Sequence, residues 1–288
     1  MERRILGNTG RELSIVGLGG VVFVGATDAE SERTVGEAVD AGINYFDVAP
    51  SYGKDQETEL RMGSALASLR LRDSVFLACK TGRRDAEGAE FELKRSLTNL
   101  QTDHFDLYQL HSITTMEDVD TAFGANGAMQ VLIAAKEAGL IRHLGFSAHS
   151  VEAALAALDR FDFDSALFPI NFVSCLNGNF GPQIIAAAEA RGTARLALKA
   201  MARTNRHPGG PTSHPNCWYE PLTDPYIAEL ALRYTLSQPI TAAVPPGDPE
   251  LYKMAVKFAG RFTPITSPEI EELRTYASTI EPVFHHAA

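Results

Sequence analysis

The stretch GINYFDVAPSYG (residues 42–53) decides the fold expected for this chain. A glycine that ends a helix is followed by a short apolar run, an acidic residue at its end, and a proline-containing loop that carries Tyr52. A short apolar strand that follows a helix and ends in a polar residue is typical of one unit of a parallel α/β sheet. Outward from this unit, the same order of strand and amphipathic helix recurs along the chain.

Eight such units can be recognised. The expected strands are 15–19, 44–47, 75–80, 105–110, 143–147, 165–170, 195–199 and 240–244, and the helices after them lie near 28–41, 57–69, 87–100, 125–138, 150–160, 183–191, 223–237 and 248–259. This is the number of units that a closed (β/α)8 TIM barrel requires. Residues 4–14 predict an N-terminal β-hairpin, and 267–280 predict an extra C-terminal helix outside the barrel. We therefore predict an α/β fold with a single barrel domain over residues 1–288.

The composition is that of a globular protein with a small-molecule ligand. Hydrophobic residues make up 45% and charged residues 22% of the chain, a balance that allows a full core. The net charge of −10 argues against nucleic acid or an anionic membrane as partner, and no apolar run is long enough to span a membrane. The cysteines Cys79, Cys175 and Cys217 form no CxxC pair, and the N-terminus lacks the apolar run of a signal peptide. Both features favour a cytoplasmic protein.

Polar side chains close three consecutive predicted strands. Asp47 ends the second strand, with Tyr52 shortly after it, while Lys80 ends the third and His111 the fourth. Because the carboxyl ends of barrel strands meet at one mouth, we expect these four side chains to lie together. There Lys80 can pair with Asp47 and lower the pKa of Tyr52 from about 10, which would make the phenol a usable acid. No histidine spacing indicates a metal site.

These motifs resemble the aldo-keto reductase family over nearly the whole chain. The resembling segments are 4–10, 42–53, 80–81, 106–111 and 145–147. By this resemblance Asp47, Tyr52, Lys80 and His111 match the family's catalytic tetrad. The resemblance implies an oxidoreductase that transfers a hydride from a nicotinamide to an aldehyde or ketone. Tyr52 would protonate the carbonyl oxygen, Lys80 and Asp47 would tune Tyr52, and His111 would orient the carbonyl substrate.

The resemblance also suggests residues for the nicotinamide end of the cofactor. Ser147 matches a residue that binds the carboxamide, whereas the next position is Ala148 where many members have Asn. On the sixth strand Leu167 stands where many members have Gln, and Asn171 would replace that amide. Lys199 ends the seventh strand, where many members stack a tyrosine on the nicotinamide.

The segment VPPGDPE (residues 244–250) resembles the family's Pro-Gly phosphate loop. It leads into a helix whose free backbone N–H groups can bind an anion, although a plain strand-to-helix turn explains it equally well on local grounds. Pro246, Gly247 and Asp248 are therefore candidate cofactor-binding residues. Asp248 and Glu250 stand where a 2′-phosphate would prefer cations. By resemblance NADPH is the first choice, and NADH is the alternative.

Two other functions fit the same residues. A barrel lyase or aldolase would use Lys80 or Lys199 as a Schiff-base amine. A catalytically weak regulatory barrel would bind the nucleotide with little turnover. The loops 112–124 and 202–222, the latter carrying Trp218, are the expected sources of substrate specificity. Because little chain follows the ninth helix, we expect an open or loop-built substrate site.

Overall fold

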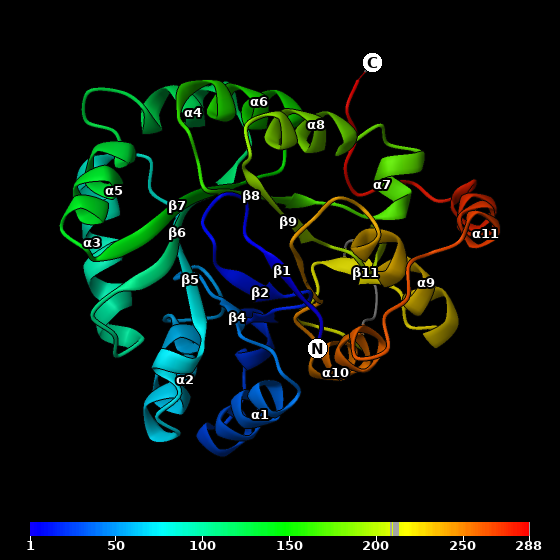
Figure 1. Ribbon diagram of the computed structural model, residues 1–288, viewed down its shortest axis with the longest axis horizontal. Helices are drawn as coiled ribbons and strands as arrows, with labels where there is room; N and C mark the ends of the chain where they lie inside the picture. The colour runs from blue at the N-terminus through cyan, green and yellow to red at the C-terminus, as the bar shows by residue number, and fades with distance from the viewer. Residues whose placement is uncertain (208, 210–212, 288) are drawn as a thin grey trace.

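The computed structural model describes residues 1–207, 209 and 213–287, and the chain forms the predicted (β/α)8 barrel (Figure 1). Eight parallel strands follow one another around the sheet: β3 (Leu18–Gly19), β4 (Tyr45–Asp47), β5 (Phe76–Thr81), β6 (Phe105–Ile113), β7 (Ile141–Ala148), β8 (Ser165–Pro169), β9 (Ala194–Leu198) and β12 (Ala242–Val244). A parallel bridge between Val16, just before β3, and Ala243 of β12 connects the two ends of the sheet. The bridge closes the ring, so all eight carboxyl ends surround one mouth.

Helices surround the barrel, as predicted. They are α1 (Asp28–Asp40), α2 (Glu57–Ser68), α3 (Ala86–Asn99), α5 (Ala128–Glu137), α6 (Val151–Arg160), α8 (Pro182–Ala190), α9 (Pro225–Leu236) and α10 (Pro249–Ala259), with α11 (Ser267–Ala277) as the extra helix. Short 3₁₀ turns, η1 (Gly20–Phe23) and η2 (Arg72–Ser74), lie in loops. Two further helices, α4 (Met116–Ala122) and α7 (Phe172–Leu176), were not predicted. Each begins at a side-chain cap, Thr115 for α4 and Asn171 for α7.

The N-terminal hairpin closes the opposite end of the barrel. Its strands β1 (Arg3–Ile5) and β2 (Glu12–Ser14) pair antiparallel, and Figure 1 shows the hairpin crossing the barrel axis. Leu6 and Leu13 are fully buried, and they pack into the barrel interior with Tyr45 and residues of other strands. Because apolar side chains fill this end of the barrel interior, the carboxyl-end mouth is where a site is expected.

The segment 202–222 is more ordered than a plain loop. Residues 208 and 210–212, part of that predicted loop, lie outside the described residues. The remainder contains the antiparallel strands β10 (Ala202–Asn205) and β11 (Tyr219–Pro221). Ala202, Cys217 and Tyr219 are buried against Leu251 of α10. This apolar contact attaches the β10–β11 hairpin to the side of the mouth, and the interpretation as an irregular loop is corrected accordingly.

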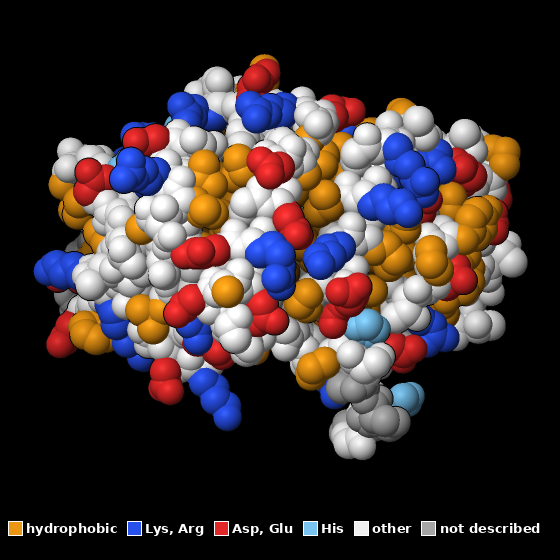
Figure 2. All heavy atoms as spheres, turned by 90° about the horizontal axis from the view of Figure 1, so that it is seen from below, with side chains coloured by type: hydrophobic (Ala, Val, Ile, Leu, Met, Phe, Trp, Pro, Cys, Tyr) orange, Lys and Arg blue, Asp and Glu red, His pale blue; other side chains and the backbone are white. Residues whose placement is uncertain are grey.

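Charge is mixed in sign on the face of the molecule drawn in Figure 2. Figure 2 shows basic and acidic side chains intermixed over the face that it draws. Within the described part of the chain, no helix has the length and apolar character needed to cross a membrane.

Candidate active site

Three neighbouring strands carry polar side chains to the open mouth. Asp47 is the last residue of β4, Lys80 the next to last of β5, and His111 lies near the end of β6. β5 is hydrogen-bonded to β4 on one side and β6 on the other. Tyr52 follows β4 in the loop that leads to α2. The parallel register therefore brings three of the four predicted residues together directly, and the β4–α2 loop adds the fourth.

Asp47 and Lys80 form a buried ion pair, with exposed fractions of 1% and 0%. The Lys80 ammonium also donates to the Val48 carbonyl at 3.3 Å. Asp47 Oδ2 accepts hydrogen bonds from the Tyr45 hydroxyl at 3.1 Å and from Gln109 Nε2 at 3.3 Å. Burial pulls the pKa of Lys80 down, but the Asp47 carboxylate outweighs burial and raises that pKa above its ordinary value. Lys80 is therefore a permanent cation in this site.

Tyr52 packs between the lysine and the histidine. The Lys80 ammonium lies 5.3 Å from the centroid of the Tyr52 ring, and the His111 ring meets it edge to face at 5.6 Å. Burial raises the pKa of Tyr52, and the charge of Lys80 offsets this only in part. The prediction that the pKa of Tyr52 is lowered is thus wrong, because burial outweighs the lysine. The phenol therefore keeps its proton near neutral pH.

His111 is held as a neutral imidazole. Burial drives its pKa well below the ordinary range, and the positive charges of Lys80, Lys199 and Arg84 add to the effect. Its Nδ1 lies 3.3 Å from the Ser51 hydroxyl. A neutral imidazole can orient a carbonyl by hydrogen bonding, but it has no extra proton to transfer.

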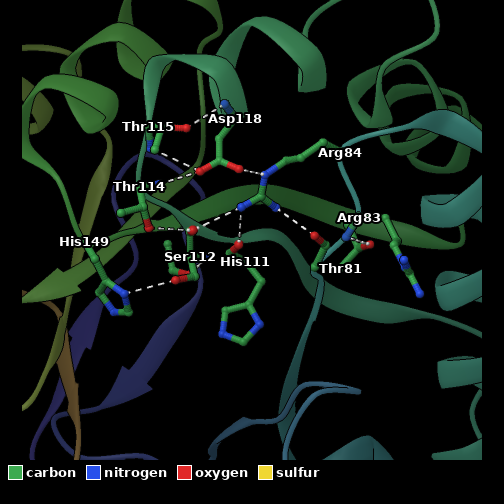
Figure 3. A network of polar contacts seen from close by, with 11 residues as sticks. Thr81, Arg83, Arg84, His111, Ser112, Thr114, Thr115, Asp118 and His149 are labelled. Carbon is green, nitrogen blue, oxygen red and sulfur yellow. Dashed lines mark hydrogen bonds and ion pairs between the residues drawn. The ribbon is translucent and has the colours of Figure 1, made fainter.

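An arginine clamp, formed by Arg84 and Asp118, fixes the end of β6 (Figure 3). Arg84 Nη2 donates to the carbonyls of His111 at 2.8 Å and Ser112 at 3.0 Å, and Arg84 Nε donates to Asp118 Oδ1 at 2.9 Å. The other oxygen of Asp118 accepts from two backbone N–H groups at the start of α4. The clamp therefore joins the loop after β5, the end of β6 and α4 around the backbone of His111.

Ser112 turns the chain immediately after His111. Its φ of +56° lies in the left-handed region, which costs a non-glycine residue energy unless neighbouring contacts hold it. Here the Ser112 N–H donates to Ser147 Oγ at 2.7 Å, and the Ser112 hydroxyl lies 3.0 Å from His149 Nδ1. Ser147 and His149 belong to β7 and its following loop, so the adjacent strand supports this turn.

A cleft of about 350 Å³ opens onto these residues. Its walls include Tyr52, Lys80, His111, Ser147, Lys199 and Trp218. A smaller cavity of about 70 Å³ shares Tyr52, Lys199 and Trp218 with it and continues toward Gly247. The cleft is large enough for a small organic molecule. Within the described residues, no group of His, Cys, Asp and Glu side chains could hold a metal ion.

The residues predicted to bind the cofactor fall into three places. Ser147 and Lys199 line the cleft. Asn171 caps α7, its Oδ1 accepting from Ser174 N at 2.9 Å, while its buried Nδ2 has no hydrogen-bond partner. Pro246 is buried beside Gly247, which lines the smaller cavity.

Asp248 occupies the N-terminus of α10 with its own carboxylate. Its Oδ1 accepts from the N–H groups of Glu250 at 3.0 Å and Leu251 at 3.1 Å, and its Oδ2 lies 3.0 Å from His214 Nδ1. A phosphate would have to displace this carboxylate in order to bind the same amides.

The C-terminal tail packs against two side chains of the cleft, although none of its residues is among those that line it. The expectation of an open or loop-built site stays a prediction. Phe284 stacks on His149 at 5.1 Å and meets Trp218 edge to face at 6.0 Å. The His286 N–H donates to the Gly178 carbonyl at 2.8 Å and anchors the tail beside α7. Few residues follow α11, but they are enough to support two side chains of the cleft.

Sequence reasoning missed Arg84, Asp118 and Ser112. A usable signal was present, because Arg83 and Arg84 follow a predicted strand end at the barrel mouth. In addition, Thr115 and Asp118 have the spacing of a capping box. Together these signals place one cation and one helix start beside the same strand ends.

The geometry agrees with the relationships of this sequence to known proteins. The model of the aldo/keto reductase family matches residues 16–203, more than half of the chain. The chain belongs to the aldo/keto reductase family. The matched region contains Asp47, Tyr52, Lys80 and His111 and ends before residues 246–248 of the predicted phosphate loop.

Individual relatives extend this result. Aldo-keto reductase YhdN of Bacillus subtilis is 34% identical over 167 residues, which cover 53% of this chain and 48% of that protein. L-galactose dehydrogenase of Arabidopsis thaliana is 33% identical over 172 residues, or 56% of this chain and 52% of that protein. The chain thus spans about half the length of the curated relatives it matches. Aldo-keto reductase AKR11C1 from Bacillus halodurans, in its holo form, shares the fold over 96% of both chains, with a TM-score of 0.73 and 24% identity.

Proposed function

We propose that this protein reduces an aldehyde or ketone to an alcohol with a nicotinamide cofactor, and that Tyr52 supplies the proton. The observation that carries the proposal is the convergence of Tyr52, Lys80 and His111 on one cleft, with Asp47 paired to Lys80 beneath it. These residues come from separate strands and a loop, and each alone has a plain structural explanation. Their arrangement around a cavity of substrate size supports a chemical role.

Each side chain has a defined task in the proposed reaction. The cofactor, when bound, supplies the hydride. Tyr52 donates its proton to the carbonyl oxygen as negative charge develops there, and the Lys80 ammonium stabilises the phenolate that remains. Asp47 keeps Lys80 charged and in place. His111, neutral and fixed from behind by the Arg84 clamp, orients the carbonyl. The same groups serve alcohol oxidation in the reverse direction.

The cofactor site is proposed to comprise Ser147, Asn171, Lys199, Pro246, Gly247 and Asp248. The lining positions of Ser147 and Lys199 fit a polar nicotinamide end. Asn171 is not among the residues that line either cavity, so its proposed role rests on the family resemblance and on its unpartnered Nδ2. The family resemblance favours NADPH. The carboxylates of Asp248 and Glu250 at the start of α10 instead favour NADH, because they would repel a 2′-phosphate there. Fluorescence titration of the purified protein with each nucleotide decides between the two.

The domain organisation and the cellular compartment are proposed from the barrel and the cysteines. We assign residues 1–288 to a single domain, because the eight units share one closed barrel. Cys79, Cys175 and Cys217 form no disulfide, which supports a reducing compartment and thus the cytoplasm.

Replacement of Tyr52 by Phe tests the proposal. Tyr52→Phe removes the only proton that the proposed mechanism transfers, so we expect the turnover number to fall by orders of magnitude while nucleotide affinity stays within about twofold. The matched control is Tyr226→Phe, because Tyr226 is 56% exposed on α9 and distant in the chain from the tetrad. With 4-nitrobenzaldehyde as substrate, turnover of Tyr52→Phe equal to that of the control would refute the assignment.

One observation supports a second candidate function, a Schiff-base lyase or aldolase. Burial lowers the pKa of Lys199 to about 8, so a fraction of this amine is neutral and nucleophilic near neutral pH. Lys80 does not fit that role, because its ion pair with Asp47 raises its pKa. Borohydride trapping of a carbonyl compound on Lys199, detected by mass spectrometry, would favour the lyase. Nucleotide binding without turnover of any carbonyl would favour a regulatory barrel.

A further inference from the structure

Lys199 is placed unusually at the cleft. It follows β9 directly with a φ of +65°, in the left-handed region. Its ammonium lies 5.2 Å from the ring centroid of Trp218 and 5.7 Å from that of Tyr219. These two aromatic faces hold the cation by cation–π attraction at the side of the cleft formed by the β10–β11 hairpin. The backbone conformation and the two rings together fix where the charge stands.

This charge has no carboxylate partner in the described structure. Lys80, the other lysine of the cleft, is neutralised by Asp47. No Asp or Glu of the described chain lies within ion-pair distance of Lys199, and none of the described residues lining the larger cleft is acidic. The smaller cavity touches Asp47 alone among acids, and Asp47 is already paired. The cleft therefore carries an uncompensated positive charge in a chain whose net charge is −10.

The environment of Lys199 favours the binding of an anion beside its ammonium group. Burial lowers its pKa to about 8, with a further contribution from Lys80, while Cys217 and Asp47 act in the opposite direction. The amine is mainly protonated at pH 7, but it is less stable in that form than an ordinary lysine. An anion beside it would restore the lost stabilisation.

The neighbouring surface suits an organic acid. Trp218 is 52% exposed and lines both cavities, so its ring is available to a ligand. The ring is supported from behind by edge contacts with Tyr219 and Phe284. A ligand that reaches Tyr52 with its carbonyl group can thus lay its apolar body near Trp218 and its charge near Lys199.

We propose that Lys199 binds a carboxylate carried by the substrate, so that the preferred substrates are carbonyl compounds that are also carboxylic acids. This inference rests on the proposed reductase function and specifies its substrate class. The carboxylate site is separate from Asp47, Tyr52, Lys80 and His111, and it shares Lys199 with the proposed nicotinamide end of the cofactor site, because Lys199 lines both cavities. The other source of an anion in the cleft is the cofactor diphosphate, and the experiments below distinguish the two.

The first experiment measures binding without turnover. Trp218 is the only tryptophan of the chain and lies beside Lys199, so its fluorescence reports on a ligand there. We expect benzoate to change the emission of the protein saturated with NADH or NADPH, whereas uncharged benzamide does not. We expect Lys199→Met to weaken benzoate binding at least about tenfold, and Lys199→Arg to retain most of it. In the wild type, benzoate affinity should fall as pH rises above about 8.

The control for overall charge is Lys94→Met. Lys94 lies on the outer face of α3 and pairs with Glu90, with 69% of its side chain exposed. This variant should bind benzoate like the wild type. If Lys199→Met binds benzoate as tightly as Lys94→Met does, the carboxylate site does not exist.

The second experiment compares a charged and a neutral substrate of the same shape. We expect the wild type to show at least about tenfold higher kcat/KM for 4-carboxybenzaldehyde than for its methyl ester, and Lys199→Met to bring the ratio close to one. A ratio near one in the wild type overturns the proposal. If Lys199→Met weakens nucleotide binding tenfold but leaves the ratio unchanged, the anion is the cofactor diphosphate, and the proposal also fails. If neither aldehyde is reduced but benzoate binding still depends on Lys199, the reductase function fails and the carboxylate site stands.

Discussion

Removal of the Arg84 side chain should damage both stability and turnover, although this residue does not line the cleft. Arg84→Met deletes the hydrogen bonds to the carbonyls of His111 at 2.8 Å and Ser112 at 3.0 Å and the ion pair with Asp118. Hydrogen bonds that involve a charged group contribute about 1.5–3 kcal/mol each when buried. The Arg84 side chain is largely buried, with 15% of it exposed, so its hydrogen bonds are shielded from water. Asp118 is not left without partners by the substitution, because it keeps its bonds to the backbone. The two hydrogen bonds to the carbonyls sum to about 3–6 kcal/mol, so we expect the free energy of unfolding to fall by about that amount.

The effect on catalysis comes from the backbone that the clamp holds. His111 needs its carbonyl anchored so that the ring points at the substrate, and Ser112 needs support for its left-handed turn. A misplacement of about 1 Å can lower turnover roughly a hundredfold. We expect kcat/KM for an aldehyde to fall about 10- to 100-fold in Arg84→Met, with nucleotide affinity unchanged. Urea unfolding followed by circular dichroism gives the stability, and the decrease of reduced-nucleotide absorbance gives the rate.

The adjacent Arg83 provides the matched control. Figure 3 shows its side chain directed away from His111, with 61% exposure and a loose ion pair to Glu92 at 3.4 Å. Arg83→Met should therefore change stability by no more than about 0.5 kcal/mol and leave turnover intact. Equal stability and equal turnover in the two arginine variants would show that the clamp does not position His111.

Two further predictions concern the charges of the site. Lys80→Met leaves the Asp47 carboxylate buried without its cation, so unfolding should become easier by about 3–5 kcal/mol. The double variant Asp47→Asn/Lys80→Met should recover much of that loss in the same urea assay, and a single variant as stable as the wild type would contradict the ion pair. Burial lowers the pKa of His149 to about 3, so this imidazole protonates near pH 6.5 only when the chain unfolds. Stability should therefore fall as pH drops from about 6.5 toward 3, with a contribution from His149 of up to about 1.4 kcal/mol per pH unit, to which His111 adds because burial lowers its pKa as well. His149→Asn should remove the His149 part of the slope, and a slope equal to that of the wild type would contradict the prediction.

The barrel could be predicted because its signals are local and repeated. Each of its strands is a short apolar run next to a helix, and the eight repeats leave few alternative folds. The helices α4 and α7 were missed because they are too short to show an amphipathic period. β10 and β11 were missed because their pairing depends on contacts with α10, which lies later in the chain.

The tetrad geometry was predictable for a related reason. In a parallel barrel, a residue that ends a strand lies at the mouth of the barrel. Asp47, Lys80 and His111 therefore had to come together once the strands were assigned. The direction of the Tyr52 pKa was not predictable in this way. It depends on how deeply the ring is buried, and burial results from the packing of the whole mouth rather than from spacing along the chain.

A substrate carboxylate at Lys199 would alter the field of the site without replacing its proton donor. The Lys199 charge is one of three, with Lys80 and Arg84, that help to keep His111 neutral, but burial of the ring is the largest cause of its lowered pKa. An anion beside Lys199 cancels part of the field and leaves the burial unchanged, so His111 stays neutral and continues to orient the carbonyl. Tyr52, which burial keeps protonated, then remains the group with a proton to transfer. Lys199 therefore selects the substrate by its charge, whereas Tyr52 transfers the proton. The two tasks belong to different side chains of the same cleft.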